Sequence, residues 1–420
     1  MNWDFLIKDK DSLCVSTDTR NLPADCVFFG LHGANFDGNK FAKQALEQGA
    51  SLAVIDNPEY ALPEGTLLVE DTLLALQDLA RAWRRELGLP IIGVTGTNGK
   101  TTTKELLAAV LSTKYNIHYT QGNLNNQIGV PLTLLQISRA HEMAIVEMGA
   151  SHPGDIKELV EIAEPNCGLI TNVGRAHLEG FGSFEGVQRT KRELYDYLVV
   201  HDGTIFRNAD NPYLASMHDS ALSSLPISNS PQSGRPIAAD AASNSRLVAY
   251  ATGTMPSGTH LVGEYNAENV SAAICVGEYF GVSREQALEA IRQYVPTNNR
   301  SQSMQTANNQ LIVDAYNANP TSMQAAINAF KGDTYILGAM RELGEYSHLE
   351  HQNIVNMLAE RKADTVFLVG EEYLQTTSPY PVFENVEQLH KHFEEQPLKG
   401  KSILLKGSRS TQMEKLLDIL

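Results

Sequence analysis

The stretch from Ile91 to Thr103 carries the clearest chemical pattern in the chain. It reads IIGVTGTNGKTTT, an apolar run followed by a glycine-rich turn, and the helical pattern KELLAAVL follows from Lys100 onward. Glycines let a backbone turn its NH groups inward, and a helix N-terminus adds partial positive charge. Lys100 then supplies a full charge to a phosphate, and Thr101 offers a hydroxyl to Mg²⁺. Val94 stands where the strict phosphate-loop pattern has its first glycine, and a glycine turn is also a common structural feature. The GKT triplet nevertheless predicts that ATP or another nucleotide binds here.

Three further polar residues have types that suit a metal–phosphate site. Glu147 follows the apolar run MAIV, His177 lies in TNVGRAHLEGFGSFEG, and Lys191 lies in RTKRELY. By residue type alone, Glu147 fits either a solvated carboxylate at a strand end or a Mg²⁺ ligand. A single histidine is more typical of an ordinary surface or core position. Lys191 in a charged run is equally typical of a solvated helix face.

The segment TGTNGKTT resembles the variant phosphate loop of the Mur ligases, a family whose relatives include folylpolyglutamate synthase. This resemblance implies two Mg²⁺ ions, one at Glu147 and a second beside His177, and a carbamylated Lys191. A carbamate converts the lysine ammonium into an anionic oxygen ligand for the metal. The catalytic residues implied in this way are Lys100, His177 and Lys191. The implied metal ligands are Thr101, Glu147, His177 and Lys191. The implied ATP contacts in the loop are Thr95, Gly96, Thr97, Asn98, Gly99, Lys100, Thr101 and Thr102.

A second motif, GEYNAENVSAA, is similar to the family pattern in which asparagine amides read the adenine edge. Asn266 and Asn269 occupy the asparagine positions, whereas Tyr265 replaces the expected histidine. Asn266 also suits the N-cap of the helix that follows, so both interpretations stay open. The resemblance further implies that Arg300 reaches an ATP phosphate and that Asp314 holds the ribose.

Several longer segments resemble one branch of the family, which adds D-alanyl-D-alanine to UDP-N-acetylmuramoyl-tripeptide. They are GNLNNQIGVPLTLL, IVDAYNANP, LGAMRELGEYSHLEHQNI and LLKGSRSTQMEKLL, and in the third of them Ala339 stands where the family usually has Asp. The N-terminal segment STDTR and the following FGLHGANFDGN are similar to the family's uridine-nucleotide domain. Arg20 is the candidate for the diphosphate, and Asn35 or Asp37 for the nucleotide, although TDTR is also a plausible turn. The substrate-binding residues implied are Thr19, Arg20, Asn35, Asn125, Asn126, Asn317 and Asn319.

The reaction implied by the resemblance is ligation through an acyl phosphate. The terminal carboxylate of the tripeptide attacks the γ-phosphate of ATP, and the dipeptide amine then attacks the activated carbonyl. Phosphoryl transfer depends mainly on positioning and on cations around the phosphate oxygens. Two alternatives remain: a sibling ligase that adds a single amino acid, or a non-catalytic protein that keeps the loop as a nucleotide switch.

The pattern of apolar runs and helical segments predicts an α/β protein of three domains, which would bring these residues together. Residues 1–86 contain short apolar runs and a helical pattern, predicting a small α/β domain that the resemblance assigns to uridine-nucleotide binding. Residues 87–297 alternate apolar runs with helical segments, which predicts a parallel sheet around the ATP loop. Residues 298–420 repeat this alternation through LIVDAY, TYILGA, TVFLVG and SILLKG, each followed by a predicted helix, as in a Rossmann-like domain. Residues 217–258, rich in Ser, Ala and Pro, are expected to be irregular or poor in strands.

Composition and charge limit which partners the protein could bind and where in the cell it is expected to be. The 420 residues carry a formal charge of −16, which argues against nucleic acid as a partner because such binding needs clustered Lys and Arg. No apolar run reaches the roughly 20 residues of a membrane span. The N-terminus, MNWDFLIKDKDSLC, has charges where a signal peptide is apolar, so we expect a soluble, cytoplasmic protein, taken to be a monomer. Four scattered cysteines are expected to be reduced core thiols.

Overall fold

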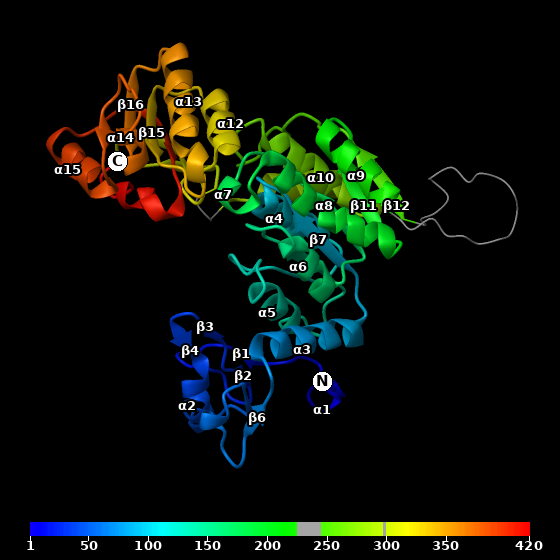
Figure 1. The fold of residues 1–420 in the computed structure, drawn as a ribbon. Coiled ribbons are helices and arrows are strands. Elements are labelled where there is room, and N and C mark those ends of the chain that lie inside the picture. The colour runs from blue at the N-terminus through cyan, green and yellow to red at the C-terminus, as the bar shows by residue number, and fades with distance from the viewer. Residues whose placement is uncertain (225–244, 297–299) are drawn as a thin grey trace, which may run out of the picture.

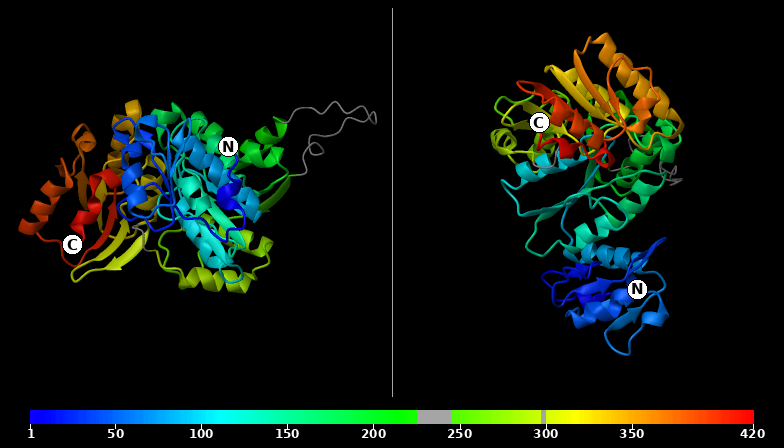
Figure 2. Two further views of the ribbon diagram at one scale, coloured as in Figure 1. Left: turned by 90° about the horizontal axis from the view of Figure 1, so that it is seen from below. Right: turned by 90° about the vertical axis from the view of Figure 1, so that its left-hand side faces the viewer.

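Three sheets follow one another along the chain in a computed structural model that describes residues 1–224, 245–296 and 300–420 (Figure 1). The N-terminal sheet lies at one end, the central sheet in the middle and the C-terminal sheet at the other end, and the right-hand view of Figure 2 shows the same order from another side. Helices alternate with strands in each unit, so the predicted α/β class is confirmed. The domain boundaries at residues 86 and 297 stay predictions.

The N-terminal unit is a parallel sheet in the order β1-β2-β5-β6, joined by a two-stranded hairpin of β3 and β4. Its strands are short, and β2 is buried along its whole length. The elements are α1 (Asp4–Ile7), β1 (Val15–Ser16), β2 (Val27–Phe29), β3 (His32–Gly33), β4 (Phe36–Asp37), α2 (Ala42–Glu47), β5 (Leu52–Ile55) and β6 (Thr66–Leu68).

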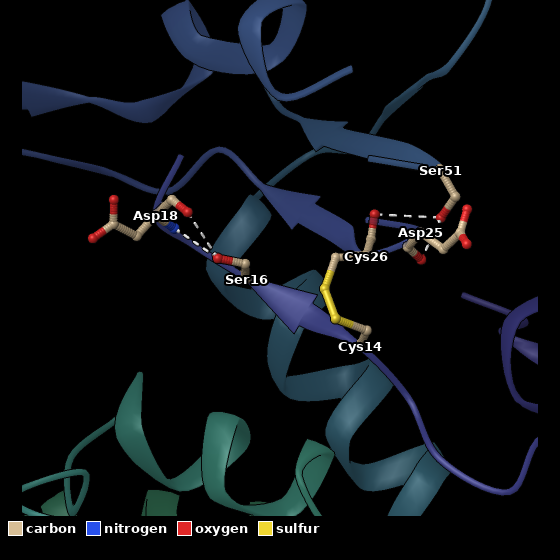
Figure 3. Close-up of a disulfide and its surroundings, with 6 residues drawn as sticks. All are labelled: Cys14, Ser16, Asp18, Asp25, Cys26 and Ser51. Carbon is tan, nitrogen blue, oxygen red and sulfur yellow. Dashed lines mark hydrogen bonds between the residues drawn. A yellow bond between two sulfur atoms is a disulfide. The ribbon is translucent and has the colours of Figure 1, made fainter. Parts of the chain in front are cut away.

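Cys14 and Cys26 form a disulfide, so the expectation that all four cysteines are reduced is wrong for this pair (Figure 3). The reason is the register of the sheet. Val15 pairs with Val27 in neighbouring parallel strands, which places the preceding residues opposite each other. The two cysteines are 12 residues apart, and no local spacing pattern announces a contact set by strand pairing. Cys167 and Cys275 are free thiols, as expected.

Helix α3 (Thr72–Leu87) joins the N-terminal sheet to the central unit. Asp71 caps its start, and Gly88 ends it in the left-handed conformation that glycine favours. The buried Trp83 donates from its indole nitrogen to the Ile137 carbonyl at 2.8 Å, and Arg84 donates to the Glu164 carbonyl. The helix therefore lies across the lower face of the central unit in Figure 1 and fixes the N-terminal sheet to it.

The central sheet has six parallel strands in the order β12-β11-β10-β7-β9-β8. Successive side chains of its core strands point to opposite faces, so Ile91 joins one apolar cluster and Ile92 the other. The elements are β7 (Ile91–Thr95), α4 (Lys100–Leu111), β8 (Ile117–Tyr119), α5 (Gly129–Leu135), β9 (Met143–Glu147), α6 (Asp155–Ala163), β10 (Cys167–Ile170), α7 (Leu178–Phe181), α8 (Phe184–Val200), β11 (Thr204–Asn208), α9 (Pro212–Ser223), β12 (Arg246–Tyr250), α10 (Asn266–Tyr279) and α11 (Arg284–Gln293).

The expectation of irregular structure over residues 217–258 is wrong for residues 217–223 and 246–250, whereas residues 251–258 contain no helix or strand, as expected. Helix α9 runs to Ser223 behind the cap of Asn211, and β12 is a strand paired in parallel with β11. β12 lies at the edge of the sheet and is only partly buried, so its sequence lacks the continuous apolar run that marks the inner strands. Residues 225–244, the middle of the predicted range, lie outside the described residues.

The C-terminal sheet has the order β13-β14-β18-β15-β16-β17, in which only the edge strand β13 is antiparallel to its neighbour. The predicted helix after SILLKG is wrong, because two short 3₁₀ helices, η5 (Arg409–Thr411) and η6 (Met413–Leu416), follow instead. The other elements are β13 (Gln302–Gln305), β14 (Gln310–Asp314), α12 (Pro320–Ala329), β15 (Thr334–Gly338), α13 (Ser347–Glu360), β16 (Thr365–Val369), α14 (Glu371–Leu374), β17 (Val382–Phe383), α15 (Val386–Glu395) and β18 (Ser402–Lys406).

The central and C-terminal units meet along α7 and the segment before it. Leu178 and Phe181 of α7 join the apolar cluster that contains Ala318 and Met323 of the C-terminal unit. Arg175 donates from its backbone nitrogen to the Thr321 hydroxyl at 3.0 Å. This junction brings the carboxyl end of the C-terminal sheet toward the loop after β7. Within the described parts of the chain, no helix is both long and apolar enough to cross a membrane.

Candidate active site

The loop after β7 has the backbone that a phosphate-binding turn requires. Gly96 and Gly99 both have positive φ, at +145° and +77°. A Cβ at Gly96 would lie 2.0 Å from the Thr171 hydroxyl, and one at Gly99 would lie 2.4 Å from Asn269 Oδ1. Only glycine fits at either position. Val94 is still inside the buried strand β7, so the loop begins later than in the strict spacing.

Lys100 is the first residue of α4 and folds back over this loop. Its Nζ donates to the carbonyls of Gly96 at 2.8 Å and Thr97 at 3.0 Å. Burial lowers the pKa of Lys100 to about 8, an effect that the nearby Glu147 carboxylate opposes and the Arg300 guanidinium reinforces. Lys100 is thus a cation beside the loop with no carboxylate within ion-pair distance among the described residues.

Glu147 ends β9, and the pairing of β9 with β7 sets it opposite Val94 at the same edge of the sheet. The carboxyl group is 1% exposed. Its Oε1 accepts from the Asn125 amide at 2.8 Å and from the Thr101 hydroxyl at 3.2 Å. Its Oε2 is buried without a hydrogen-bond partner in the described structure, with Lys104 Nζ 4.0 Å away. A buried carboxylate oxygen left open beside a hydroxyl is a donor set that suits Mg²⁺, which takes one or two carboxylates together with water and phosphate oxygens.

His177 and Lys191 both lie against the Phe181 ring, at 6.2 Å between ring centroids and 5.7 Å from Nζ. The imidazole of His177 forms an ion pair with Glu342 of the C-terminal unit. Lys191 on α8 is 2% exposed, and its Nζ makes no hydrogen bond or ion pair with any described residue. Burial, reinforced by the charge of Lys100, holds the pKa of Lys191 well below its usual range.

Asn266 and Asn269 lie in the first turn of α10, both buried. Asn269 donates to Asn266 Oδ1 at 2.9 Å and accepts from the Thr103 hydroxyl at 3.0 Å, which ties α10 to α4. The Asn266 amide donates to the Val262 carbonyl at 2.8 Å. Tyr265, not Asn266, holds the N-cap position, so the capping interpretation of Asn266 is wrong.

The C-terminal unit supplies the opposite wall. Asp314 ends β14 and pairs at 2.5 Å with the buried Lys406, which ends the neighbouring strand β18. The guanidinium of Arg300 lies 3.8 Å from the centroid of the Tyr316 ring, and that of Arg409 lies 5.8 Å from it. These groups gather at the carboxyl end of a mostly parallel sheet, where ligands of such folds bind.

One cavity of about 710 Å³ lies between the two walls and is lined mainly by polar groups. Most of the predicted site residues line it: Thr97, Asn98, Gly99, Lys100, Thr101, Thr102, Asn125, Asn126, Glu147, His177, Asn266, Asn269, Arg300, Asp314 and Asn317. Thr95, Gly96 and Lys191 do not line it, and the amide of Asn319 spans the junction to Asn98 Oδ1 at 2.8 Å. Asn319 also caps α12.

The predicted N-terminal residues do not line this cavity. Arg20 is exposed and pairs with Asp18, and its hydrogen bonds hold the pKa of that carboxyl at about 2. Thr19 is buried in the same turn, and Asn35 is exposed in the β3–β4 hairpin. Asp37 caps the turn after that hairpin by accepting from the Asn39 backbone nitrogen.

Sequence reasoning missed several lining residues, among them Tyr316, Glu342, Lys406 and Arg409. Lys406 had a usable signal, because a lysine directly after the apolar run SILL stands at a strand end. Ala339 is fully buried between the ends of β15 and β16, and its side chain does not line the cavity. The residue that departs from the family pattern there serves packing in this chain.

Models of three consecutive protein domains match the sequence. They are described as the Mur ligase family catalytic domain over residues 14–84, the Mur ligase middle domain over residues 94–277, and the Mur ligase glutamate ligase domain over residues 299–409. The chain belongs to the Mur ligase family.

Particular relatives narrow the comparison. The UDP-N-acetylmuramoyl-tripeptide–D-alanyl-D-alanine ligase of Bacillus subtilis is 34% identical over 97% of this chain and 92% of its own length. A crystal structure of MurF from Acinetobacter baumannii superposes with a TM-score of 0.80 at 29% identity, covering 96% of this chain and 92% of its own. The MurF ligase of Thermotoga maritima in complex with ADP gives 0.81 at 25% identity, with 98% of both chains covered.

Proposed function

We propose that this chain is the ATP-dependent ligase that joins D-alanyl-D-alanine to UDP-N-acetylmuramoyl-tripeptide, a step in peptidoglycan synthesis. The observation that carries the proposal is the polar cavity between the phosphate loop of the central unit and the carboxyl end of the C-terminal sheet. A ligase of three substrates needs such a shared chamber. Similarity to curated ligases of this name over nearly the whole chain supports the same conclusion.

ATP is the nucleotide that this cavity suits. The glycine loop and Lys100 offer inward NH groups and a cation to the phosphates. Arg300 adds a second cation on the opposite wall, and Asp314 is the candidate for the ribose. Asn266 and Asn269 are the candidates for the adenine edge. The ADP bound in the Thermotoga relative supports this assignment.

Two Mg²⁺ ions fit the residues present. The open Oε2 of Glu147 and the Thr101 hydroxyl would hold one ion, and His177 with a carbamylated Lys191 would hold the other. Bound Mg²⁺ would neutralise the charge that develops on phosphate oxygens. The buried Lys191 suits carbamylation because its lowered pKa favours the neutral amine, which is the form that reacts with CO₂. Glu342 would have to release His177 for the second ion.

The chain's own residues would then act as follows. Lys100 and Arg300 position the γ-phosphoryl group while a tripeptide carboxylate oxygen attacks its phosphorus and ADP leaves. The dipeptide amine attacks the acyl phosphate carbon, inorganic phosphate leaves, and the nitrogen loses a proton. Asn125 and Asn126 on one wall and Asn317 on the other are the candidates that hold the peptide groups, with Asn319 behind them. Closure of the two walls would exclude the water that hydrolyses acyl phosphates.

The remaining partners follow from the same reaction. Thr19, Arg20 and Asn35 are the candidates for the uridine nucleotide, with the N-terminal sheet as its platform. We infer a cytoplasmic monomer without a nucleic-acid partner, because both substrates are soluble and the chain carries a charge of −16. The Cys14–Cys26 disulfide is unusual for a cytoplasmic protein, because thiols in the cytoplasm are kept reduced.

A panel assay tests the proposal. The protein is incubated with Mg²⁺, ATP and UDP-muramoyl peptides of different length, each with D-alanyl-D-alanine or with a single amino acid, and products are identified by mass. We expect product with the tripeptide and the dipeptide. Product with a single amino acid instead would support the sibling ligase, which the names of the curated relatives do not favour.

A further inference from the structure

A tyrosine–serine hydrogen bond crosses the junction between the two units, and both of its residues line the cavity. Tyr265 stands at the start of α10 in the central unit, and Ser301 directly precedes β13 in the C-terminal unit. The tyrosine hydroxyl and Ser301 Oγ lie 2.6 Å apart. The ring of Tyr265 lies against Gly263, where a Cβ would approach Tyr265 Cε1 to 2.3 Å. The glycine leaves the space that lets the tyrosine ring reach across.

Ser301 has a backbone conformation that needs support. Its φ is +49°, in the left-handed region that residues other than glycine rarely adopt. Such a conformation persists only where surrounding contacts hold it. Ser301 is buried, its hydroxyl bonds to Tyr265, and the next residue, Gln302, forms an isolated bridge with Leu261. Both contacts come from the central unit, so the central unit holds this turn.

Arg300, one residue earlier, has a hydrogen-bond donor that no described residue uses. It lines the cavity, and its Nε is buried without a hydrogen-bond partner in the described structure. Its guanidinium packs 3.8 Å from the centroid of the Tyr316 ring. A buried donor beside the phosphate loop, with no protein acceptor, is available to an anion.

We propose that Tyr265 is a positioning residue: by anchoring Ser301 it aims Arg300 at the phosphates of the bound nucleotide. The inference rests on the proposed function, because the ligand it invokes is ATP or ADP. A turn at Ser301 that is free to relax to negative φ would redirect the side chain next to it. The tyrosine hydroxyl would therefore act on the phosphates through its hydrogen bond to Ser301 and the backbone that joins Ser301 to Arg300.

The opposing interpretation gives Tyr265 a purely local role in the adenine pocket, since Asn266 is its neighbour in sequence. The two interpretations predict different ligands to be affected. Loss of an arginine contact weakens only ligands that carry phosphate, whereas damage to the adenine pocket weakens adenosine and ADP alike.

Binding of ADP and of adenosine to the full chain separates them, measured by competition against a fluorescent ADP analogue with Mg²⁺ present. We expect Tyr265→Phe and Ser301→Ala each to weaken ADP binding about fivefold, the scale of one hydrogen bond, and to leave adenosine binding unchanged. The double variant should be no weaker than either single variant, because both remove the same bond. In an Arg300→Gln background, Tyr265→Phe should have no further effect.

Tyr279→Phe is the matched control. Tyr279 lies at the far end of the same helix, and its hydroxyl lies 3.2 Å from the Thr204 hydroxyl, away from the cavity. It should bind both ligands as the parent does. Equal weakening of adenosine and ADP by Tyr265→Phe, or no change in either, would overturn the inference. A parent protein that binds neither ligand would overturn the proposed function as well. If Tyr265→Phe unfolds, Ser301→Ala carries the test.

Discussion

The two walls of the cavity are built in different ways. On the central wall, Thr97 to Thr102 form one continuous segment, the loop after β7 and the first turn of α4, and Glu147 joins them because β9 pairs with β7. On the C-terminal wall, Asp314 and Lys406 meet through the pairing of β14 with β18, and Arg300 comes from the segment before β13, which pairs with β14. Charge is also handled differently, because Lys406 is neutralised by Asp314 whereas Lys100 contacts only loop carbonyls.

This difference explains which site residues can be predicted from the sequence. A phosphate loop needs its glycines, lysine and threonine in fixed order, because one turn of backbone must place them all. The C-terminal wall requires only polar side chains at the ends of neighbouring strands, with no fixed spacing in the sequence. Motifs therefore reveal the first wall, and strand order assembles the second.

Replacing Lys100 with alanine should have the largest effect on ligase activity. We expect kcat to fall at least about 100-fold, as when a preorganised donor to a transition state is removed. The melting temperature should stay close to that of the parent, because Lys100 Nζ bonds only loop carbonyls. Lys391→Ala is the control, since that lysine is exposed on α15 in the C-terminal unit. Near-parental ligation by a folded Lys100→Ala protein would remove the phosphate loop from the mechanism.

Lys191 tests whether a residue outside the phosphate-loop motif is also needed on the central wall, because it lies on α8 and does not line the cavity. If the carbamate is the working species, Lys191→Ala and Lys191→Arg should each lose about 100-fold in kcat, since neither can provide the anionic ligand. Added formate or acetate should restore part of the rate in the alanine variant only. Labelled bicarbonate should give a carbamate signal in the parent protein. Full activity of Lys191→Arg would end the carbamate hypothesis.

Metal dependence tests Glu147 and His177. We expect Glu147→Ala and His177→Ala each to lower activity and to raise the Mg²⁺ concentration for half-maximal activity about tenfold. Glu105→Ala is a matched control: Glu105 Oε1 lies 3.2 Å from the same Lys104, but its side chain does not line the cavity. An unchanged Mg²⁺ titration in both site variants would show that neither residue holds the metal.

The pKa of Lys100 predicts a smaller effect, on nucleotide binding. Raising the pH from 7 to 9 takes the proton from a lysine with a pKa of about 8, so ADP affinity should fall about tenfold. Lys100→Arg should flatten this dependence, since arginine stays charged. Deprotonation of Lys100 would not itself destabilise the fold. A lysine pKa lowered in the folded state means that the unfolded chain binds more protons between pH 8 and pH 10.5, so this group adds stability as pH rises there. A flat profile in the parent would contradict the position given to Lys100.

Much of the fold could be predicted because its buried strands appear as apolar runs in the sequence. β7, β9, β14, β15, β16 and β18 all lie where such runs were found. β12 was missed because an edge strand is half exposed and needs no such run. The Cys14–Cys26 bond was missed because only strand register brings the two residues together.

The site was predictable to the extent that local sequence determines it. Lys100, Thr101 and Glu147 follow from a loop and a strand end. Nothing local indicates that Glu342 meets His177 or that Ser301 meets Tyr265, since these contacts depend on how two units dock. The local order of the chain sets the central wall, strand pairing sets the C-terminal wall, and the docking of the two units sets the contacts between them.

Coupled phosphate release tests the central claim, that the two walls form one ligase site, most directly. Inorganic phosphate and ligated product are measured together with Mg²⁺ and ATP, first with UDP-N-acetylmuramoyl-tripeptide or D-alanyl-D-alanine alone and then with both. We predict sustained phosphate release only with both, matched by product in a ratio of about one, since each ligation discharges one acyl phosphate. Sustained release with ATP alone, or release with both substrates but without product, would contradict the account.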